Sequence, residues 1–308
     1  MKIFRGISKI KKHRRVVVAL GVFDGLHRGH LNILKAVVKK AKQVSGTSVV
    51  LTFWPHPQKE ESLYSLQHRL SLLDALGIDI CIIINFNKEF SKISAEVFIK
   101  DILVNKIGAQ YIYIGKNFRF GSLAHGNYNL LCKAAKIYKY SVKKFSMVCV
   151  NKKPVSSTAI RKLIRQGNLA ASKKLLGRRV SVLGSVIKGS RLGSRIGFPT
   201  ANINPHHEVI PPAGIYAAKI ILFGKTYYGI CYIGRRPTIY AKNMSDRIEV
   251  HIFDFYKNIY GEYLEIQFLK LIRPDKKFAS IGDLTQQIQK DIISCRKILC
   301  IASKNHNS

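Results

Sequence analysis

Acidic side chains are scarce in this sequence. Asp and Glu number 17 against 52 Lys and Arg in 308 residues, which gives a formal net charge of +35. Such an excess favours contact with phosphates, but nucleic-acid binders gather their charge in a stripe or an arm. Here the basic residues are spread, and they concentrate only at 9–15 (KIKKHRR) and weakly at 173–179 (KKLLGRR). We therefore expect no dedicated nucleic-acid partner, solvated positions for most of the charge, and some attraction for phosphorylated ligands.

Cysteine pairs and long apolar runs are also missing. The six cysteines are scattered without a CxxC pair, which argues against a zinc ribbon or a disulfide scaffold and favours a reducing, cytoplasmic location. No stretch approaches about 20 uninterrupted apolar residues, so we expect no membrane span. Residues 16–23 follow a basic stretch as in a signal peptide, but Asp24 interrupts the run and no small-residue cleavage site follows. We predict a buried strand there.

The length predicts two domains, and the pattern of the first half is that of a parallel sheet covered by helices. Runs of β-branched residues alternate with amphipathic stretches in this half. We expect its strands at 16–21, 48–53, 80–85, 110–114 and 141–148, and its helices at 29–44, 66–76, 95–106, 127–138 and 156–167. This half is predicted to be a nucleotide-binding α/β domain.

From about Gly177 the strand-like runs follow one another closely, with Gly and Pro between them. They lie at 180–187, 216–222, 227–233, 248–255 and 264–268, before an amphipathic stretch at 281–301. This spacing predicts a small antiparallel β-barrel with a helix packed on it. The expected domains are therefore residues 1–176 and 177–308.

A segment rich in glycine and histidine joins the run at 16–21 to the next predicted helix. It reads GVFDGLHRGH from Gly21 to His30. Gly25 and Gly29 allow a ligand to approach the backbone, and a helix that begins near Gly29 offers its N–H groups to an anion. His27 lies three residues before His30, so both rings can face one phosphate. A zinc pair is the alternative, but no HExxH glutamate or nearby cysteine completes its ligands.

Three further segments accompany this motif, namely TFWPHP at 52–57, GKNFRFG at 115–121 and SSTAIR at 156–161. With these segments in this order, the first half resembles the FMN adenylyltransferase domain of the prokaryotic bifunctional riboflavin kinase/FAD synthetases, within the HxGH nucleotidyltransferase superfamily. The resemblance implies a Rossmann-like domain. It also implies a reaction in which the FMN phosphate attacks the α-phosphorus of ATP and pyrophosphate leaves.

The resemblance and the chemistry of phosphate binding suggest site residues for this half. The catalytic candidates are His27, His30 and Arg161, which neutralise charge on the triphosphate together with Mg²⁺. The flavin candidates are Asn117, Phe118 and Arg119, and the ATP candidates are Gly21, Phe23, Asp24, Gly25, Gly29, Ser156, Ser157 and Thr158. Two alternatives stay open: one of residues 156–158 merely caps a helix, and Phe118 or Phe120 belongs to the core.

A second glycine-rich segment, GSVIKGSRLGSRIGFPTAN, runs from Gly184 to Asn202. Gly189 and Gly193 supply a pliant backbone that can wrap phosphates, although the spacing is not that of a P-loop. The string GFPTAN at 197–202 resembles the riboflavin kinase signature, and matching segments follow at 214–217, 234–238, 249–255 and 260–261. Together with the first half, the resemblance covers nearly the whole chain.

In this family the riboflavin kinase domain is a small antiparallel barrel, and its site residues carry over to this sequence by position. The resemblance implies that Thr200 and Asn202 hold Mg²⁺ and the ATP phosphates, with Gly189 and Gly193 also at the nucleotide. Glu249 would be the general base on the riboflavin hydroxyl. Judged by pattern alone, Glu249 is an outward-facing strand residue that alternates with Ile248 and Val250, and Asp246 and Asp254 are rival carboxylates.

The sequence thus predicts a bifunctional enzyme that makes FMN from riboflavin and FAD from FMN, with MgATP in both steps. Its partners would be riboflavin, FMN and ATP, with no membrane partner, and its oligomeric state stays open. Three positions depart from the family pattern: Asn117, Ala159 and Ser190. The alternatives are an FAD synthetase with a weak kinase half, a nucleotidyltransferase for another phosphorylated alcohol, and a basic nucleic-acid-binding protein.

Overall fold

The computed structural model describes residues 1–7, 10, 12–57, 61–189, 192–236 and 245–304. The chain divides into two compact units, Met1–Ser157 and Thr158–Ser308. This division lies earlier in the chain than the predicted boundary at 176/177. The reason is that nearly all of helix α6 (Ser157–Arg165) and the whole of α7 (Leu169–Leu176) belong to the second unit. The boundary at 176/177 stays a prediction.

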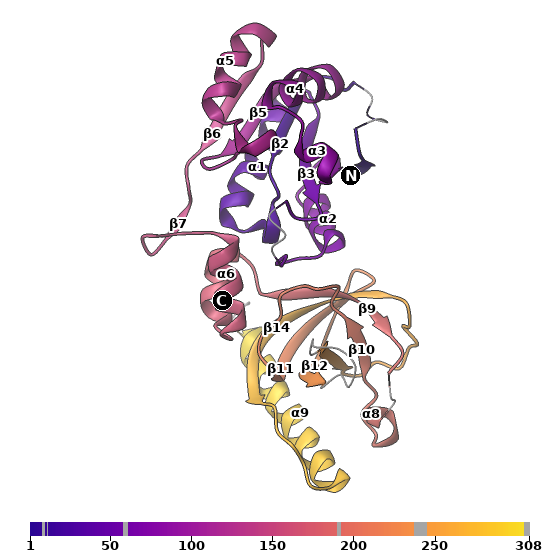
Figure 1. Cartoon of the computed structure of the whole chain (residues 1–308). Coiled ribbons are helices and arrows are strands. Elements are labelled where there is room, and N and C mark those ends of the chain that lie inside the picture. Colours follow the sequence, from indigo (N-terminus) through magenta and orange to yellow (C-terminus); the bar gives the residue numbers. More distant parts are fainter. Residues whose placement is uncertain (8–9, 11, 58–60, 190–191, 237–244, 305–308) are drawn as a thin grey trace. The chain divides into compact units, whose positions relative to one another are not determined.

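The first unit is built on a parallel sheet, as predicted, and this sheet has six strands where five were expected (Figure 1). Its strands occur in the order β1 (Lys2–Arg5), β4 (Ile80–Asn85), β3 (Ser48–Trp54), β2 (Val16–Leu20), β5 (Ala109–Gly115) and β6 (Ser141–Phe145). Strands β2, β3 and β4 are nearly fully buried, which is why their sequences are continuous apolar runs. The edge strand β1 is mostly exposed and was not predicted from the pattern.

Helices cover both faces of this sheet, because successive residues of its central strands point to opposite sides. Val16 and Val18 pack with the π-helix Phe98–Ile107 and with α5, whereas Val17 and Ala19 pack with α1 and α2. The helices are α1 (Arg28–Gln43), α2 (Leu66–Ala75), α3 (Lys88–Ser91), α4 (Ala95–Val97), which leads into the π-helix, and α5 (Tyr128–Tyr138). The predicted strand at 141–148 ends at Phe145, and a small hairpin of β7 (Cys149–Val150) and β8 (Lys153–Pro154) follows.

The strand order locates a ligand site in the first unit. The chain passes from the central strand β2 outward to β3 and β4, and then returns to place β5 on the other side of β2. In open α/β sheets, ligands bind outside the carboxyl ends of the strands where the order reverses in this way. The segments after β2 and β5 are GVFDGLH and KNFRFG, which are the two motifs of the first half.

The second unit is a closed antiparallel barrel, in agreement with the sequence pattern (Figure 1). Its strands occur in the order β10 (Ala201–Asn204), β13 (Ser245–Ile252), β12 (Lys225–Arg236), β11 (Gly214–Leu222), β14 (Tyr263–Pro274) and β9 (Ser181–Ile187). The short strand β10 was not predicted, and it closes the barrel by pairing with both β9 and β13. The short helix α8 (Leu192–Arg195) lies in the flap between β9 and β10.

The predicted terminal helix, α9 (Ile281–Lys304), packs on strands β11, β12 and β14. Cys295 is fully buried in this contact, together with Ile215, Ala217, Ile230 and Phe253 of the barrel. Burial raises the pKa of the Cys295 thiol to about 11, which keeps it neutral and unreactive at physiological pH. Among the helices of the described residues, none has the length and apolar character needed to cross a membrane.

Two candidate active sites

The turn after β2 has a strained backbone that neighbouring side chains hold in place. Phe23 and Leu26 adopt left-handed φ angles of 52° and 37°, which are uncommon for residues other than glycine. The carbonyl of Val22 accepts hydrogen bonds from Thr52 Oγ1 at 2.9 Å and from Arg69 Nη1 at 2.7 Å. Arg69 is only 3% exposed, and desolvation lowers the pKa of its guanidinium. These donors fix the backbone that carries the histidine motif.

Asp24 and Gly25 tie this turn to a distant segment. The buried carboxylate of Asp24 accepts a hydrogen bond from the backbone N–H of Leu63 at 2.9 Å. The backbone carbonyl of Asp24 accepts one from Ser157 Oγ at 3.0 Å. Gly25 has a φ of 73°, and a Cβ there would lie 2.5 Å from Leu63 Cδ1, so only glycine fits. These contacts of Asp24 are structural, and its predicted role toward ATP stays a prediction. Ser157 lies next to the motif, and its predicted role in phosphate binding stays a prediction.

His27 and His30 lie together at the start of α1. Their rings stack with centroids 3.7 Å apart. The rings of Phe23 and His30 pack in a T-shaped arrangement with centroids 5.4 Å apart. The helix begins at Arg28, one residue before the predicted start, because His27 is its N-cap and Nδ1 accepts from the N–H of His30 at 3.4 Å. Gly29 is next to this cap, and a Cβ there would lie 3.1 Å from the His27 ring. Both imidazoles are thus held at a helix N-terminus, where backbone N–H groups favour an anion.

The predicted flavin residues lie on the turn after β5. Asn117 and Arg119 are exposed, and Asn117 contacts Met147 Sδ at 3.9 Å. Phe118 is half-buried and its ring stacks on that of Phe120, with centroids 5.7 Å apart. Phe120 is buried in the core, as one of the two alternatives for these residues proposed, and Phe118 packs against that core. The other predicted phosphate residues lie at or after the join: Thr158 is exposed, and Arg161 on α6 is 7% exposed in the second unit.

Strands β10 and β13 build the second site. Asn202 lies directly opposite Glu249 in their register, so the two side chains share one face of the sheet. Two residues before Asn202, the hydroxyl of Thr200 donates to Glu249 Oε2 at 3.5 Å. The flap glycines lie against this pair: a Cβ on Gly189 would lie 2.0 Å from the Asn202 amide, and one on Gly193 would lie 2.4 Å from the carbonyl of Phe198 and 3.0 Å from Thr200 Oγ1. The glycines therefore allow the flap to approach Thr200 and Asn202 closely.

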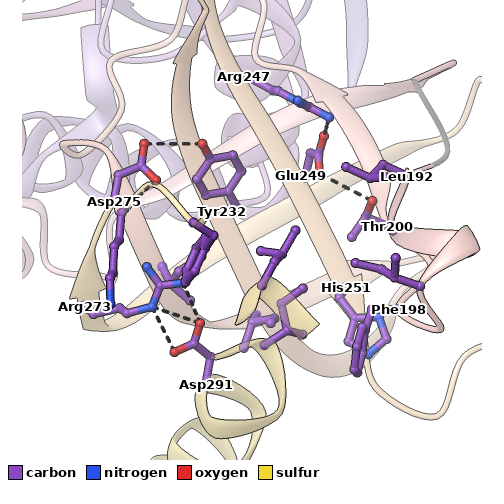
Figure 2. Close-up of a pocket in the computed structure, with 18 residues that line it drawn as sticks. Leu192, Phe198, Thr200, Tyr232, Arg247, Glu249, His251, Arg273, Asp275 and Asp291 are labelled. Carbon is purple, nitrogen blue, oxygen red and sulfur yellow. Dashed lines mark hydrogen bonds and ion pairs between the residues drawn. The ribbon is translucent and has the colours of Figure 1, made fainter. Parts of the chain in front are cut away.

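A cavity of about 260 Å³ opens in front of Glu249 (Figure 2). Apolar side chains such as Ile215, Ile230 and Phe278 line it, with Thr200 and Glu249 at one end. At the other end are Arg273, Asp275 and Asp291. Tyr232 pairs with Glu249 in the register of β12 and β13, and its hydroxyl donates to Asp275 at 3.4 Å. An apolar cavity with a few polar groups is typical of a site for a small organic ligand.

The wall of this cavity opposite Glu249 is held by a buried ion pair. Arg273 of β14 donates to Asp291 of α9 from Nε at 3.1 Å and from Nη2 at 2.9 Å, and Asp291 is 2% exposed. Gln287 donates to the same carboxylate at 3.0 Å. The fork geometry fixes α9 against the barrel. Sequence reasoning missed this pair, because its two members are joined only by the packing of α9 on the strand.

A second cavity, of about 330 Å³, lies next to the first. It is bounded by the strand residues Val250 and Ile252 and by the segment from Phe255 to Tyr260 that follows β13. Thr200 lines both cavities. Thr200, whose hydroxyl contacts Glu249, therefore borders both spaces.

Of the three carboxylates considered for the base, Glu249 lines the first of these two cavities, and Asp254 lines neither. Asp254 follows β13, is highly exposed and pairs with Arg296 at 3.6 Å. The side chain of Asp246, like residues 237–244 and Ser190, lies outside the part of the structure that is described. A residue that sequence reasoning missed, Arg247, also lines the first cavity and forms an ion pair with Glu249. Arg247 lies two residues before Glu249 in the same strand, and this spacing predicts that the two side chains share one face.

Comparisons with known proteins bear on both halves. The model of the family described as FAD synthetase matches residues 9–159, and that of the family described as riboflavin kinase matches residues 176–299. A bifunctional riboflavin kinase/FMN adenylyltransferase of Buchnera aphidicola is 38% identical, covering 96% of this chain and 98% of its own length. The protein of the same description from Haemophilus influenzae is 35% identical over 95% of this chain and 97% of its own length.

A solved structure is also similar. It is a crystal structure from Streptococcus pneumoniae described as a macrolide-efflux protein, with a TM-score of 0.80 and 28% sequence identity over 94% of this chain and 97% of that one. Since two family models together match most of the sequence and relatives above 30% identity align along almost its entire length, the chain belongs to the bifunctional riboflavin kinase/FMN adenylyltransferase family.

Proposed function

We propose that the second unit transfers the γ-phosphoryl group of ATP to riboflavin and that the first unit adenylylates the resulting FMN to FAD. The observation that carries the kinase assignment is the position of Thr200, which lines both cavities of the barrel and contacts Glu249. A two-substrate kinase needs two pockets that meet at one point, with a carboxylate beside that point.

In this proposal, riboflavin occupies the first cavity and the nucleotide occupies the second. The riboflavin hydroxyl lies at Glu249 Oε2, and the γ-phosphorus lies near Thr200. A bond forms between the hydroxyl oxygen and the γ-phosphorus while the bond from that phosphorus to the bridging oxygen of ADP breaks. The hydroxyl proton goes to Glu249, which acts as the general base. The apolar walls exclude water, so that the hydroxyl of riboflavin is the attacking group.

Thr200 and Asn202 suit Mg²⁺ as oxygen donors. Both are neutral: Thr200 contacts the Glu249 carboxylate and Asn202 lies opposite Glu249 in the strand register. Mg²⁺ is commonly bound by a few protein oxygens together with the phosphates of a nucleotide. When bound, Mg²⁺ would supply neutralisation of charge on the phosphates. The chain's own contribution is to hold these two oxygens against the flap through the close approach of Gly189 and Gly193.

In the first unit, a phosphate oxygen of FMN attacks the α-phosphorus of ATP. A new P–O bond forms as the bond to the bridging oxygen breaks, and pyrophosphate leaves. His27 and His30, stacked at the start of α1, hold the triphosphate, and Ser156 is proposed to add a donor. The phosphate-binding roles of Thr158 and Arg161 stay predictions. FMN lies toward the turn after β5, with Asn117, Phe118 and Arg119 as its proposed contacts. No covalent enzyme intermediate is required.

Two variants with opposite effects test this assignment. Glu249→Gln keeps the shape of the side chain and removes the proton acceptor, so riboflavin phosphorylation should fall by about 10²–10⁴-fold while adenylylation of supplied FMN persists. The double variant His27→Ala, His30→Ala should abolish FAD synthesis and leave FMN formation intact. The measurement is chromatography of the flavins formed from riboflavin or FMN with MgATP. Undiminished FMN formation in Glu249→Gln, or normal FAD synthesis in the double variant, would remove the respective residues from the mechanism.

A further inference from the structure

The ion pair between Arg247 and Glu249 lies inside the first cavity. Both residues are on β13, two positions apart, so their side chains project from the same face of the strand. They line the cavity together, whereas Ile248 and Val250 between and after them are 1% exposed in the core. Figure 2 shows the guanidinium of Arg247 directed toward the carboxylate of Glu249.

The two oxygens of the Glu249 carboxylate have different neighbours. Nη2 of Arg247 contacts Oε1, and Thr200 Oγ1 donates to Oε2 at 3.5 Å. The contact with Thr200 is long for a hydrogen bond between oxygens, so Oε2 is held loosely and can exchange this donor for another hydroxyl. The arginine therefore engages one oxygen and leaves the other toward Thr200, which lines both cavities.

This pair differs from an ordinary surface ion pair. The side chain of Glu249 is 14% exposed and that of Arg247 is 28% exposed, beside a cavity whose walls are largely apolar. A mostly buried carboxylate without a compensating partner would be costly, and the guanidinium of Arg247 compensates the charge at Oε1. An exposed pair in the same unit, Arg296 with Asp254 at 3.6 Å, lacks these features, with exposures of 55% and 78%.

We propose that Arg247 is a positioning residue for riboflavin phosphorylation. By holding Oε1, it keeps Oε2 of Glu249 aimed at the riboflavin hydroxyl, without itself touching the reacting atoms. This inference rests on the proposed role of Glu249 as the general base. It adds to that role a specific residue that sets the orientation of the base.

Substitution of Arg247 tests the proposal through the turnover number. In Arg247→Met the carboxylate is free to rotate, so kcat for riboflavin phosphorylation should fall on the order of 10- to 100-fold, the size of effect that misplacement of a catalytic group produces. The KM values for riboflavin and ATP should change by less than about threefold, because ground-state binding is not removed. Arg247→Lys restores the charge without the fork and should recover part of kcat. Arg296→Met removes the exposed pair and should leave kcat unchanged.

Folding is checked independently in every variant. Thermal melting of the full chain and adenylylation of supplied FMN should match the wild-type protein in Arg247→Lys and Arg296→Met. If Arg247→Met melts early, the comparison of Arg247→Lys with the wild type decides the matter: the lysine variant should have a reduced kcat at normal stability. A wild-type kcat in both Arg247 variants would overturn the proposal.

A double variant separates this inference from the proposed function. If Arg247 acts through Glu249, adding Arg247→Met to Glu249→Gln should lower kcat no further than Glu249→Gln does alone. A further fall of about 10-fold, or a large rise in the KM for ATP in Arg247→Met, would mean that the arginine contacts the phosphates directly, which contradicts the proposal. Normal kcat in Glu249→Gln would instead overturn the assignment of the base, on which the inference depends.

Discussion

At the scale of single residues, the imidazole of His27 has two roles, one in capping a helix and one in the proposed phosphate site. Its Nδ1 caps α1 by accepting from the N–H of His30, and its ring stacks on that of His30 at the proposed phosphate site. A loss of FAD synthesis after replacement by alanine could therefore come from the lost cap as well as from the lost imidazole. A residue that caps equally well but has no imidazole distinguishes these two causes.

Asparagine is such a residue, since it is among the best N-caps. We expect His27→Asn to keep the thermal stability of the protein close to that of the wild type and yet to lose FAD synthesis. His27→Ala should lose the activity and also about 1 kcal/mol of stability. Thermal melting and FAD formation from supplied FMN measure the two effects, and FMN formation from riboflavin serves as the control. A His27→Asn enzyme with normal FAD synthesis would reduce His27 to a capping residue.

At the scale of elements, α7 belongs structurally with the barrel. It contacts β14, and its residues Ser172 and Leu176 are fully buried. The helix ends at Leu176 and is capped by Gly177, which adopts a left-handed φ of 81° and donates its N–H to the carbonyl of Lys173 at 2.9 Å. A kinase fragment that begins at the predicted boundary, residue 177, therefore lacks a helix that packs against strand β14 of the barrel.

Two fragments test the boundary. Residues 158–308 should fold and phosphorylate riboflavin, whereas 177–308 should unfold with a free energy lower by at least about 2 kcal/mol, the cost of removing one large buried side chain such as Leu176. Urea unfolding followed by fluorescence measures this difference, and riboflavin phosphorylation below the transition reports whether the site is intact. Equal stability of the two fragments would show that α6 and α7 add nothing to the barrel and would favour the boundary at 176/177.

At the scale of the whole molecule, the charge has an energetic consequence. Even if each of the 17 acidic side chains compensated one basic side chain, 35 positive charges would remain. Repulsion among so many like charges destabilises the compact state, and salt screens it. The same positive field attracts ATP and FMN, both of which are anionic.

We expect the melting temperature to rise by several degrees between about 0.02 and 0.3 M KCl, as the Debye length falls from roughly 20 Å to roughly 6 Å. Differential scanning fluorimetry measures this dependence. Partial acetylation of lysines, which removes positive charge, should weaken it. A melting temperature that is constant or falls with salt would mean that the repulsion is already balanced by local pairing.

Much of the first unit could be predicted because its strands are buried on both faces. The predicted bounds of β2, β3 and β4 agree with the structure to within one residue, since each is an apolar run between polar segments. Strand β10 could not be predicted in this way. It has four residues, two of them asparagine, and it is a strand because it pairs with β9 on one side and with β13 on the other. Its pairing partners are distant in the sequence, so local composition does not indicate them.

The sequence by itself determined the family, the two fold classes and the motif residues, because periodicity and side-chain chemistry are local properties of the chain. Only the tertiary structure decided which side chains meet. The register of β10 with β13 places Asn202 opposite Glu249, and the packing of α9 brings Asp291 to Arg273. Such pairs depend on how strands and helices far apart in the chain are aligned, and a shift by one residue would turn each strand side chain to the other face. The environment of Glu249, including Arg247 and Thr200, is therefore a property of the folded barrel.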